Sequence, residues 1–125
     1  MSAKPAVMLW LGPVDLVSRM PEAVLADAGG VAGRRTVLWP MTVAALSASL
    51  AEGTVPDAVF SALFWRAGDV LEVARVLSVG GYRGRYRVIV PPLPQPDMVR
   101  REVRAAHTEL DFDLIPLERK GSTPG

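Results

Sequence analysis

The sequence predicts a three-layer α/β domain built around a five-stranded, mainly parallel sheet. Five short apolar runs, rich in β-branched or aromatic residues, alternate with four stretches of helical length. The runs are apolar on both faces, which favours buried strands of a parallel sheet over half-exposed antiparallel ones. A length of 125 residues, with half of the residues hydrophobic, fits a single domain.

The predicted strands take up the five apolar runs. They are Val7–Leu11, Arg35–Trp39, Ala58–Ala62, Arg87–Val90 and Phe112–Leu117. Right-handed crossovers and short connections between such strands favour the order 2-1-3-4-5, which is the order of flavodoxin-like proteins.

The predicted helices lie between the strands. They are Val14–Ala28, Thr42–Glu52, Asp69–Val79 and Asp97–His107. Thr42 and Asp69 are expected N-caps, and Glu72 stands three residues after Asp69, which is the spacing of a capping box. We expect the α/β domain to cover residues 5–118 and the tail 119–125, which contains Pro and Gly, to be disordered.

Composition excludes several classes of site. The absence of Cys excludes disulfide frameworks, thiolate zinc sites and cysteine nucleophiles, and a single His (His107) excludes a multi-histidine metal site. The net charge of +1 gives no general attraction to nucleic acid or to an anionic membrane. No apolar run reaches the length of a membrane span. We expect a cytoplasmic protein, and the preference for Arg over Lys indicates GC-rich coding and a bacterial source.

From Pro56 onward, the order of residues resembles the receiver domain of response regulators. The segment Pro56–Ala62 resembles the third strand of that family, which begins Pro-Asp and ends at the phosphate-accepting Asp. The segment Gly68–Leu77 resembles the loop and helix that follow, Arg87–Val90 the fourth strand, and Leu114–Leu117 the end of the fifth. The first half of the chain matches by the order of its elements. The resemblance implies a flavodoxin-like fold and a role in signalling.

The positions that carry receiver chemistry are changed in this chain. Ala62 stands at the position of the phosphate acceptor, and Gly12-Pro13 stand where the family has its magnesium-binding acidic pair. Pro92 occupies the region of the switch hydroxyl, and Ile115 replaces the Lys before the final proline. A one-residue shift would bring Ser61 to the acceptor position, without an activating base. We therefore expect a degenerate receiver that is not phosphorylated, holds no metal or cofactor, and is not an enzyme.

The family ends with a fifth helix, which this sequence does not predict after Leu117. One face of the sheet would then be covered by Val14–Ala28 alone. Leaving about 400 Å2 of apolar surface uncovered forgoes on the order of 10 kcal/mol. We expect a partner protein or a second copy of the chain to cover this face.

Two groups of residues are candidates for contacting a partner or an anion. The first comprises six arginines, with Tyr82 and Tyr86 interleaved among them. The arginines are Arg83, Arg85, Arg87, Arg100, Arg101 and Arg104. The second comprises the tryptophans Trp10, Trp39 and Trp65, each at or just beyond the end of a predicted strand. Arginine with aromatic residues can bind single-stranded nucleic acid, but the low net charge favours an acidic protein partner or an ordinary solvated surface.

The sequence favours a non-catalytic interaction or assembly module in bacterial signalling. The alternative is a protein, such as an enzyme subunit, that binds a small ligand or nucleotide at the carboxyl ends of the strands through Trp10, Trp39 and the arginines. The proline-rich stretch Val90–Pro96 is interpreted as a stiff connector rather than a docking motif.

Overall fold

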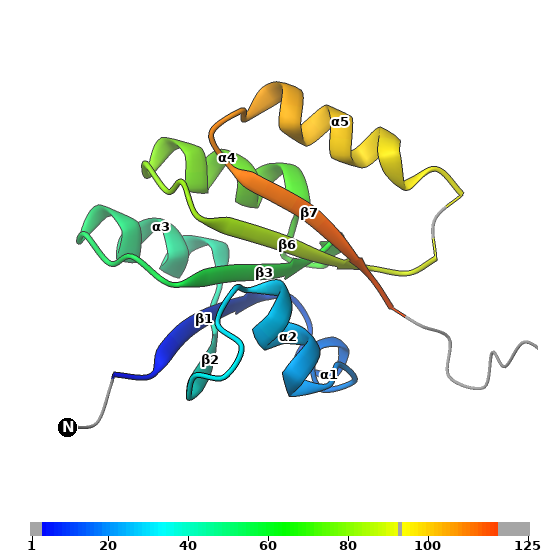
Figure 1. The fold of residues 1–125 in the computed structure, drawn as a ribbon. Coiled ribbons are helices and arrows are strands. Elements are labelled where there is room, and N and C mark those ends of the chain that lie inside the picture. The colour runs from blue at the N-terminus through cyan, green and yellow to red at the C-terminus, as the bar shows by residue number, and fades with distance from the viewer. Residues whose placement is uncertain (1–3, 93, 118–125) are drawn as a thin grey trace, which may run out of the picture.

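A computed structural model describes residues 4–92 and 94–117 of the chain. Its sheet contains the strands β1 (Ala6–Leu11), β2 (Thr36–Pro40), β3 (Ala58–Ala62), β6 (Arg85–Val90) and β7 (Asp111–Pro116). They pair in parallel in the order β2-β1-β3-β6-β7 (Figure 1). The predicted fold class and strand order are confirmed. The predicted tail 119–125 lies outside the described residues.

Helices cover the sheet unequally. The helices α1 (Val14–Val17) and α2 (Glu22–Ala28) pack on one face of the sheet. The helices α3 (Val43–Ala51), α4 (Val70–Val79) and α5 (Pro96–Ala106) lie side by side on the other face (Figure 1). The predicted caps are confirmed, because Thr42 accepts a hydrogen bond from the Ala45 N–H and Asp69 accepts one from the Glu72 N–H.

The predicted helix Val14–Ala28 is wrong as a single element. It breaks into α1 and α2 at Pro21, which becomes the N-cap of α2 with φ −60° and ψ 138°. Proline disfavours helical geometry in the residue before it and has no N–H to continue the helical ladder. The chain therefore turns at residues 18–20 before α2 begins.

A short hairpin follows β3 that sequence reasoning did not predict. The strands β4 (Phe64–Trp65) and β5 (Gly68–Asp69) pair antiparallel directly before α4. Phe64 is 74% exposed, whereas Trp65 packs against residues on both sides of the sheet. The hairpin thus sits over the carboxyl end of the sheet and is anchored there by one tryptophan.

The larger part of the core lies between the sheet and the helices α3, α4 and α5. Leu46, Leu77 and Val103 come from the three helices, and Tyr86 and Phe112 come from the strands below them. The rings of Tyr86 and Phe112 meet edge to face with their centroids 5.4 Å apart. From β1 to β7 this face of the sheet is apolar except for the buried hydroxyl groups of Ser61 and Tyr86.

The second part of the core lies under α1 and α2. It is built from Met8, Trp10 and Phe60 on the strands, with Val17 and Leu25 on the helices. Toward β6 it reaches the buried side chain of Ile89, and the half-buried Ile115 of β7 packs against it. It contains no other residue of these two strands.

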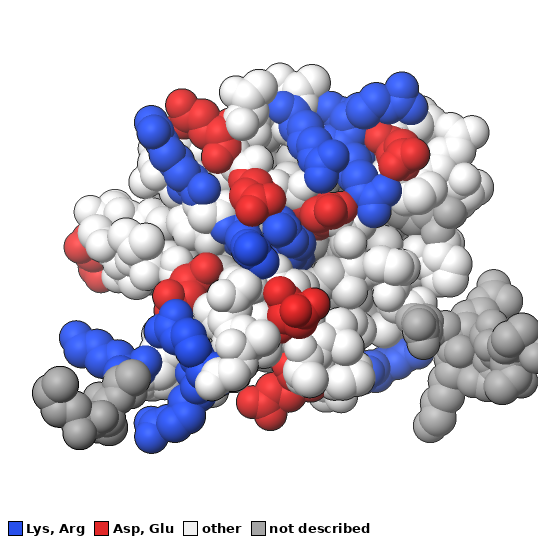
Figure 2. Space-filling view, in the orientation of Figure 1, with Lys and Arg blue, Asp and Glu red and all other residues white. Residues whose placement is uncertain are grey.

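The face of β6 and β7 that no described helix covers is charged, which corrects the expectation of an apolar one. Tyr86 and Phe112 point toward α4 and α5, so their neighbours in the strands point the opposite way. Those neighbours are Arg85, Arg87, Asp111 and Asp113. Figure 2 shows basic and acidic side chains interspersed over this part of the surface. The sequence argument from exposed apolar area therefore does not apply to this face.

Candidate functional site

The carboxyl ends of four strands bring the receiver-like positions into one row. Leu11 pairs with Ser61, so Gly12 follows β1 beside Ala62 at the end of β3. Ala62 pairs with Ile89, and Ile89 pairs with Ile115. We call Gly12, Ala62, Ile89 and Ile115 the carboxyl-end row. It contains no polar side chain.

The carboxyl-end row is closely packed around Gly12. A Cβ atom added to Gly12 would lie 2.9 Å from the Trp10 ring and 3.1 Å from the Cβ of Ala62, and its φ of +148° already favours glycine. Trp10 is fully buried, and its Nε1 donates a hydrogen bond to the Pro13 carbonyl at 3.1 Å. Ala62 is also buried. An acidic side chain at residue 12 would therefore have no space.

The Ser61 side chain points to the face of the sheet opposite Ala62 and is hydrogen-bonded there. Its Oγ donates to the Ala62 carbonyl at 2.8 Å and lies 2.6 Å from the Tyr86 hydroxyl. Because the single Ser61 proton is committed to Ala62, the Tyr86 hydroxyl donates to Ser61. Burial raises the pKa of Tyr86 above its ordinary value. Ser61 is fully buried, so no phosphodonor in solvent reaches its hydroxyl.

The other receiver-like positions carry no polar side chain either. Pro13 precedes α1, and Pro92 lies exposed beyond β6. Asp15, in the first turn of α1, is the nearest acidic residue after β1 in the sequence. Within residues 4–92 and 94–117, no group of three or more His, Asp or Glu side chains is placed to hold a metal ion.

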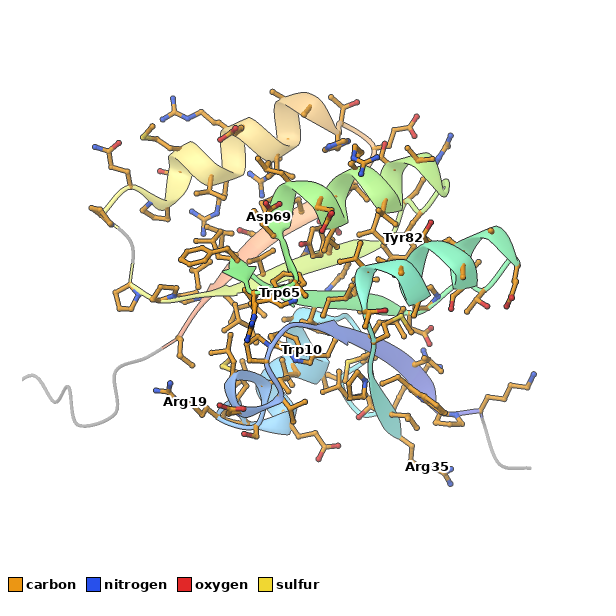
Figure 3. All side chains as sticks on the ribbon, turned by 180° about the vertical axis from the view of Figure 1, so that it is seen from behind. Trp10, Arg19, Arg35, Trp65, Asp69 and Tyr82 are labelled. Carbon is orange, nitrogen blue, oxygen red and sulfur yellow. The ribbon has the colours of Figure 1, made fainter. Side chains whose placement is uncertain are left out.

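A groove of about 800 Å3 lies beside the carboxyl ends of β1 and β2. Gly12 and Pro13 line one side of it, the start of α3 lines another, and Trp65, Arg66 and Glu72 come from the hairpin and α4. Figure 3 shows Trp65 close to Trp10, far from Tyr82 at the other end of the sheet. Sequence reasoning missed this groove because it depends on the hairpin. The turn of the hairpin is Arg66-Ala67, which is not a turn dipeptide, so the sequence offers no specific signal for it beyond the glycine at residue 68.

The candidate arginines are distributed along β6 and α5 rather than gathered into one basic site. Five of them lie within ion-pair distance of carboxylates, and the sixth, Arg101, donates from its Nε to the Asp97 carbonyl. The shortest of these ion pairs joins Arg100 Nε to Asp113 at 2.6 Å. Arg104 also donates two hydrogen bonds to the Phe112 carbonyl, at 2.8 and 3.1 Å. These arginines tie α5 and β6 to β7.

Asp113 is the centre of this network. Burial alone would raise its pKa, but hydrogen bonds from Arg100 and from the Leu114 N–H, with the charges of Arg100 and Arg104, lower it below its ordinary value. Hydrogen bonds to Asp113 and Asp97 raise the pKa of Arg100. The Asp113 carboxylate therefore accepts a hydrogen bond from Arg100 and forms ion pairs with Arg100 and Arg104.

The three tryptophans have three different environments. Trp10 is fully buried, Trp65 is half-buried at the groove, and Trp39 is 57% exposed on the outer strand β2. Only Trp39 therefore offers most of its ring to a partner. The structure does not bring Trp10, Trp39 and the arginines together into one binding site.

Comparison with known proteins supports the fold. No protein-family model and no curated protein matches the sequence. Among solved structures, the chain is similar to a response regulator receiver protein from Sinorhizobium medicae WSM419, with a TM-score of 0.53 and 18% identity. The similarity covers 94% of this chain and 86% of that one. The chain has a receiver-like fold. Within the described part of this receiver-like domain, no helix is long and apolar enough to cross a membrane.

Proposed function

We propose that this receiver-like domain is a non-catalytic interaction module of a bacterial signalling system and works without phosphorylation. The observation that carries the proposal is the apolar, closely packed carboxyl-end row. A receiver-like fold suggests signalling, and this row removes the chemistry by which such a fold would be switched. What remains available for function is its surface.

Phosphoryl transfer needs a nucleophile together with groups that neutralise charge on the phosphoryl oxygens. A methyl group at Ala62 cannot attack phosphorus, and Ile89 and Ile115 cannot donate a hydrogen bond to phosphate. The hydroxyl of Ser61 is buried and bonded to Ala62 and Tyr86. Neither the row nor the residue beside it provides the required groups.

Incubation with acetyl phosphate and Mg2+, followed by intact-mass measurement, tests this proposal. We expect no gain of a phosphoryl group, while a receiver with an acidic acceptor gains one under the same conditions. The variant Ser61→Ala serves as the matched control, because it lacks the hydroxyl of the residue next to Ala62 in the carboxyl-end row. A phosphoryl gain in the wild type that disappears in Ser61→Ala would refute the proposal, and so would a gain at any other residue of the carboxyl end.

The groove favours a second candidate function, which is binding of a small ligand at the carboxyl ends of the strands. Its volume lies in the range of ligand sites, and it combines apolar walls with the guanidinium of Arg66 and the carboxylate of Glu72. A ligand that binds the folded state raises the melting temperature. A saturable rise with a nucleotide or a small anion, abolished by Arg66→Ala but kept by Arg75→Ala, would favour this function over the first.

A further inference from the structure

One stretch of the chain at an edge of the molecule has no charged residue of its own, although the Glu22 carboxylate accepts a hydrogen bond from the Thr36 hydroxyl at one end of it. The 16 residues Thr36–Ala51 contain no Lys, Arg, Asp or Glu, although 22% of the whole chain is charged. This stretch forms β2, one of the two outer strands of the sheet, and α3, the helix at the β2 end of its layer (Figure 1). We call Thr36–Ala51 the uncharged edge.

The solvent side of α3 is unusual for a surface helix. Leu46 is its only fully buried residue, and small residues occupy its exposed positions. They are Ala44, Ala45, Ser47, Ala48 and Ala51. Surface helices ordinarily carry charged residues on this side, as α4 and α5 do here. Trp39 adds an exposed aromatic ring on β2, where it alternates with Leu38, whose side chain packs on the α2 side of the sheet.

The backbone of β2 is available for pairing. The Ala6 N–H donates to the Arg35 carbonyl, and the Met41 N–H donates to the Trp10 carbonyl. In a parallel ladder this register directs the backbone N–H and C=O groups of residues 35, 37, 39 and 41 toward β1. The backbone N–H and C=O groups of Thr36 and Leu38 therefore point outward, away from the sheet. Exposed edges are usually protected by charges, bulges or prolines. Here Pro40 stands at the end of the strand and the Glu22 carboxylate lies beside Thr36 at its start, and the strand residues between them carry no charge.

We propose that the uncharged edge is the interface of a homodimer. Two copies of β2 pair antiparallel across a two-fold axis at Leu38, and their α3 helices lie alongside each other. Leu38 exchanges backbone hydrogen bonds with Leu38 of the partner subunit, and the Thr36 N–H donates to the carbonyl of the partner's Pro40. Trp39 covers Val37 of the partner subunit. The proposal rests on the proposed function, since it names the surface through which the module associates.

A second copy is the occupant that the charges favour. Beyond Thr36, whose hydroxyl donates to Glu22, residues Val37–Ala51 offer no charge of their own, so a partner's Lys or Glu placed against them would lose water without gaining a counter-charge from this stretch. Every other described helix and both β6 and β7 carry charged residues. A two-fold axis places the same uncharged edge against itself. Because Pro40 has no N–H, the strand pairing stays short. Because both copies use the same edge, the interface is saturated in the dimer and the assembly closes there.

Light scattering after size exclusion, over a range of concentrations, tests the interface. We expect the wild type to be dimeric at about 100 μM and Ala48→Arg to raise the dissociation constant at least tenfold. Ala105→Arg is the matched control, because it adds the same side chain at an exposed position of α5. A wild type that is monomeric at this concentration, or equal weakening by both variants, would overturn the proposal.

Amide hydrogen exchange tests the strand pairing itself. The Leu38 and Thr36 amides are expected to exchange slowly in the wild-type dimer and rapidly in Ala48→Arg. Rapid exchange of both amides in a wild-type dimer would show that the copies meet elsewhere. The phosphorylation experiment is independent of this one: a phosphoryl gain would end the proposed function and leave the dimer, whereas a monomer would end the interface and leave the proposed function.

Discussion

Successive residues of β6 and β7 meet two different environments. Tyr86, Val88 and Phe112 pack beneath α4 and α5 and are fully buried. Arg85 and Asp111, on the opposite side of the same strands, form an ion pair at the surface. The difference shows that the strand residues are charged on the side that no helix of residues 4–92 and 94–117 covers.

The two faces of these strands contribute differently to stability. Burial of apolar surface stabilises the fold by about 25 cal/mol per Å2, so the helix-covered face carries most of the free energy. Exposed ion pairs contribute about 0–1 kcal/mol each. The charged face keeps the uncovered strands compatible with water and adds little to the free energy of unfolding.

The largest effect is expected from the helix-covered face. Phe112→Ala should lower the free energy of unfolding by about 3–5 kcal/mol, because it empties a packed site beside Tyr86. Asp111→Ala, at the preceding residue on the open face, should cost about 1 kcal/mol or less. Urea unfolding monitored by circular dichroism measures both. Equal losses for the two variants would contradict the distinction between the faces.

The carboxyl-end row is expected to behave like the helix-covered face. Ala62→Asp places an unpaired carboxylate in a buried site and should cost at least about 2 kcal/mol of unfolding free energy. It should still gain no phosphoryl group, because neither Gly12 nor Pro13 supplies a metal ligand. Ala105→Asp, at an exposed helix position, is the control for the added charge. A stable Ala62→Asp that accepts phosphate from acetyl phosphate would show that the row is open to solvent.

The buried hydroxyl pair under α4 and α5 should give an intermediate effect. Ser61→Ala leaves the Tyr86 hydroxyl without its acceptor and should cost about 1–3 kcal/mol. In the double variant Ser61→Ala/Tyr86→Phe both partners are removed, so the further loss should be small. Thermal or urea unfolding of the two variants checks this. A double variant much less stable than Ser61→Ala would mean that the Tyr86 hydroxyl has another partner.

The smallest effect is expected for the pH dependence of the free energy of unfolding that comes from Asp113, on the charged face of β6 and β7. The pKa of Asp113 is lower in the folded state than in the unfolded chain, so the stability it contributes is present above the unfolded pKa and is lost as the pH falls through the folded pKa. Asp113→Asn should therefore reduce stability by about 1 kcal/mol or less at neutral pH. The difference from the wild type should shrink below about pH 4. A difference that persists unchanged at low pH would show that Asp113 acts through packing instead of charge.

The sequence predicted the fold well, because the strand runs and the caps are local signals. The bounds of β3 agree to the residue, and Thr42 and Asp69 cap their helices as expected. The break at Pro21 was visible in the sequence but was outweighed by the apolar stripe of the predicted helix.

The candidate site was predicted less completely. The apolar identity of the carboxyl-end row followed from the receiver resemblance, but its packing depends on the positive φ of Gly12 and the position of the Trp10 ring. The charged face was missed because Arg87–Val90 was taken as the strand. The alternation that reveals a half-exposed strand begins at Arg85, and Asp111-Phe112-Asp113-Leu114 repeats it. The groove required the hairpin, which sequence reasoning did not predict.

The carboxyl-end row has a consequence for how such a module is regulated. The side chains of Ala62, Ile89 and Ile115 are hydrocarbons that neither take up protons nor change oxidation state, so the row itself stays the same over a wide range of cellular conditions. Under the proposed function, the row keeps no chemical record of an upstream signal. The occupancy of a complex is then set by how many copies the cell makes and by the law of mass action.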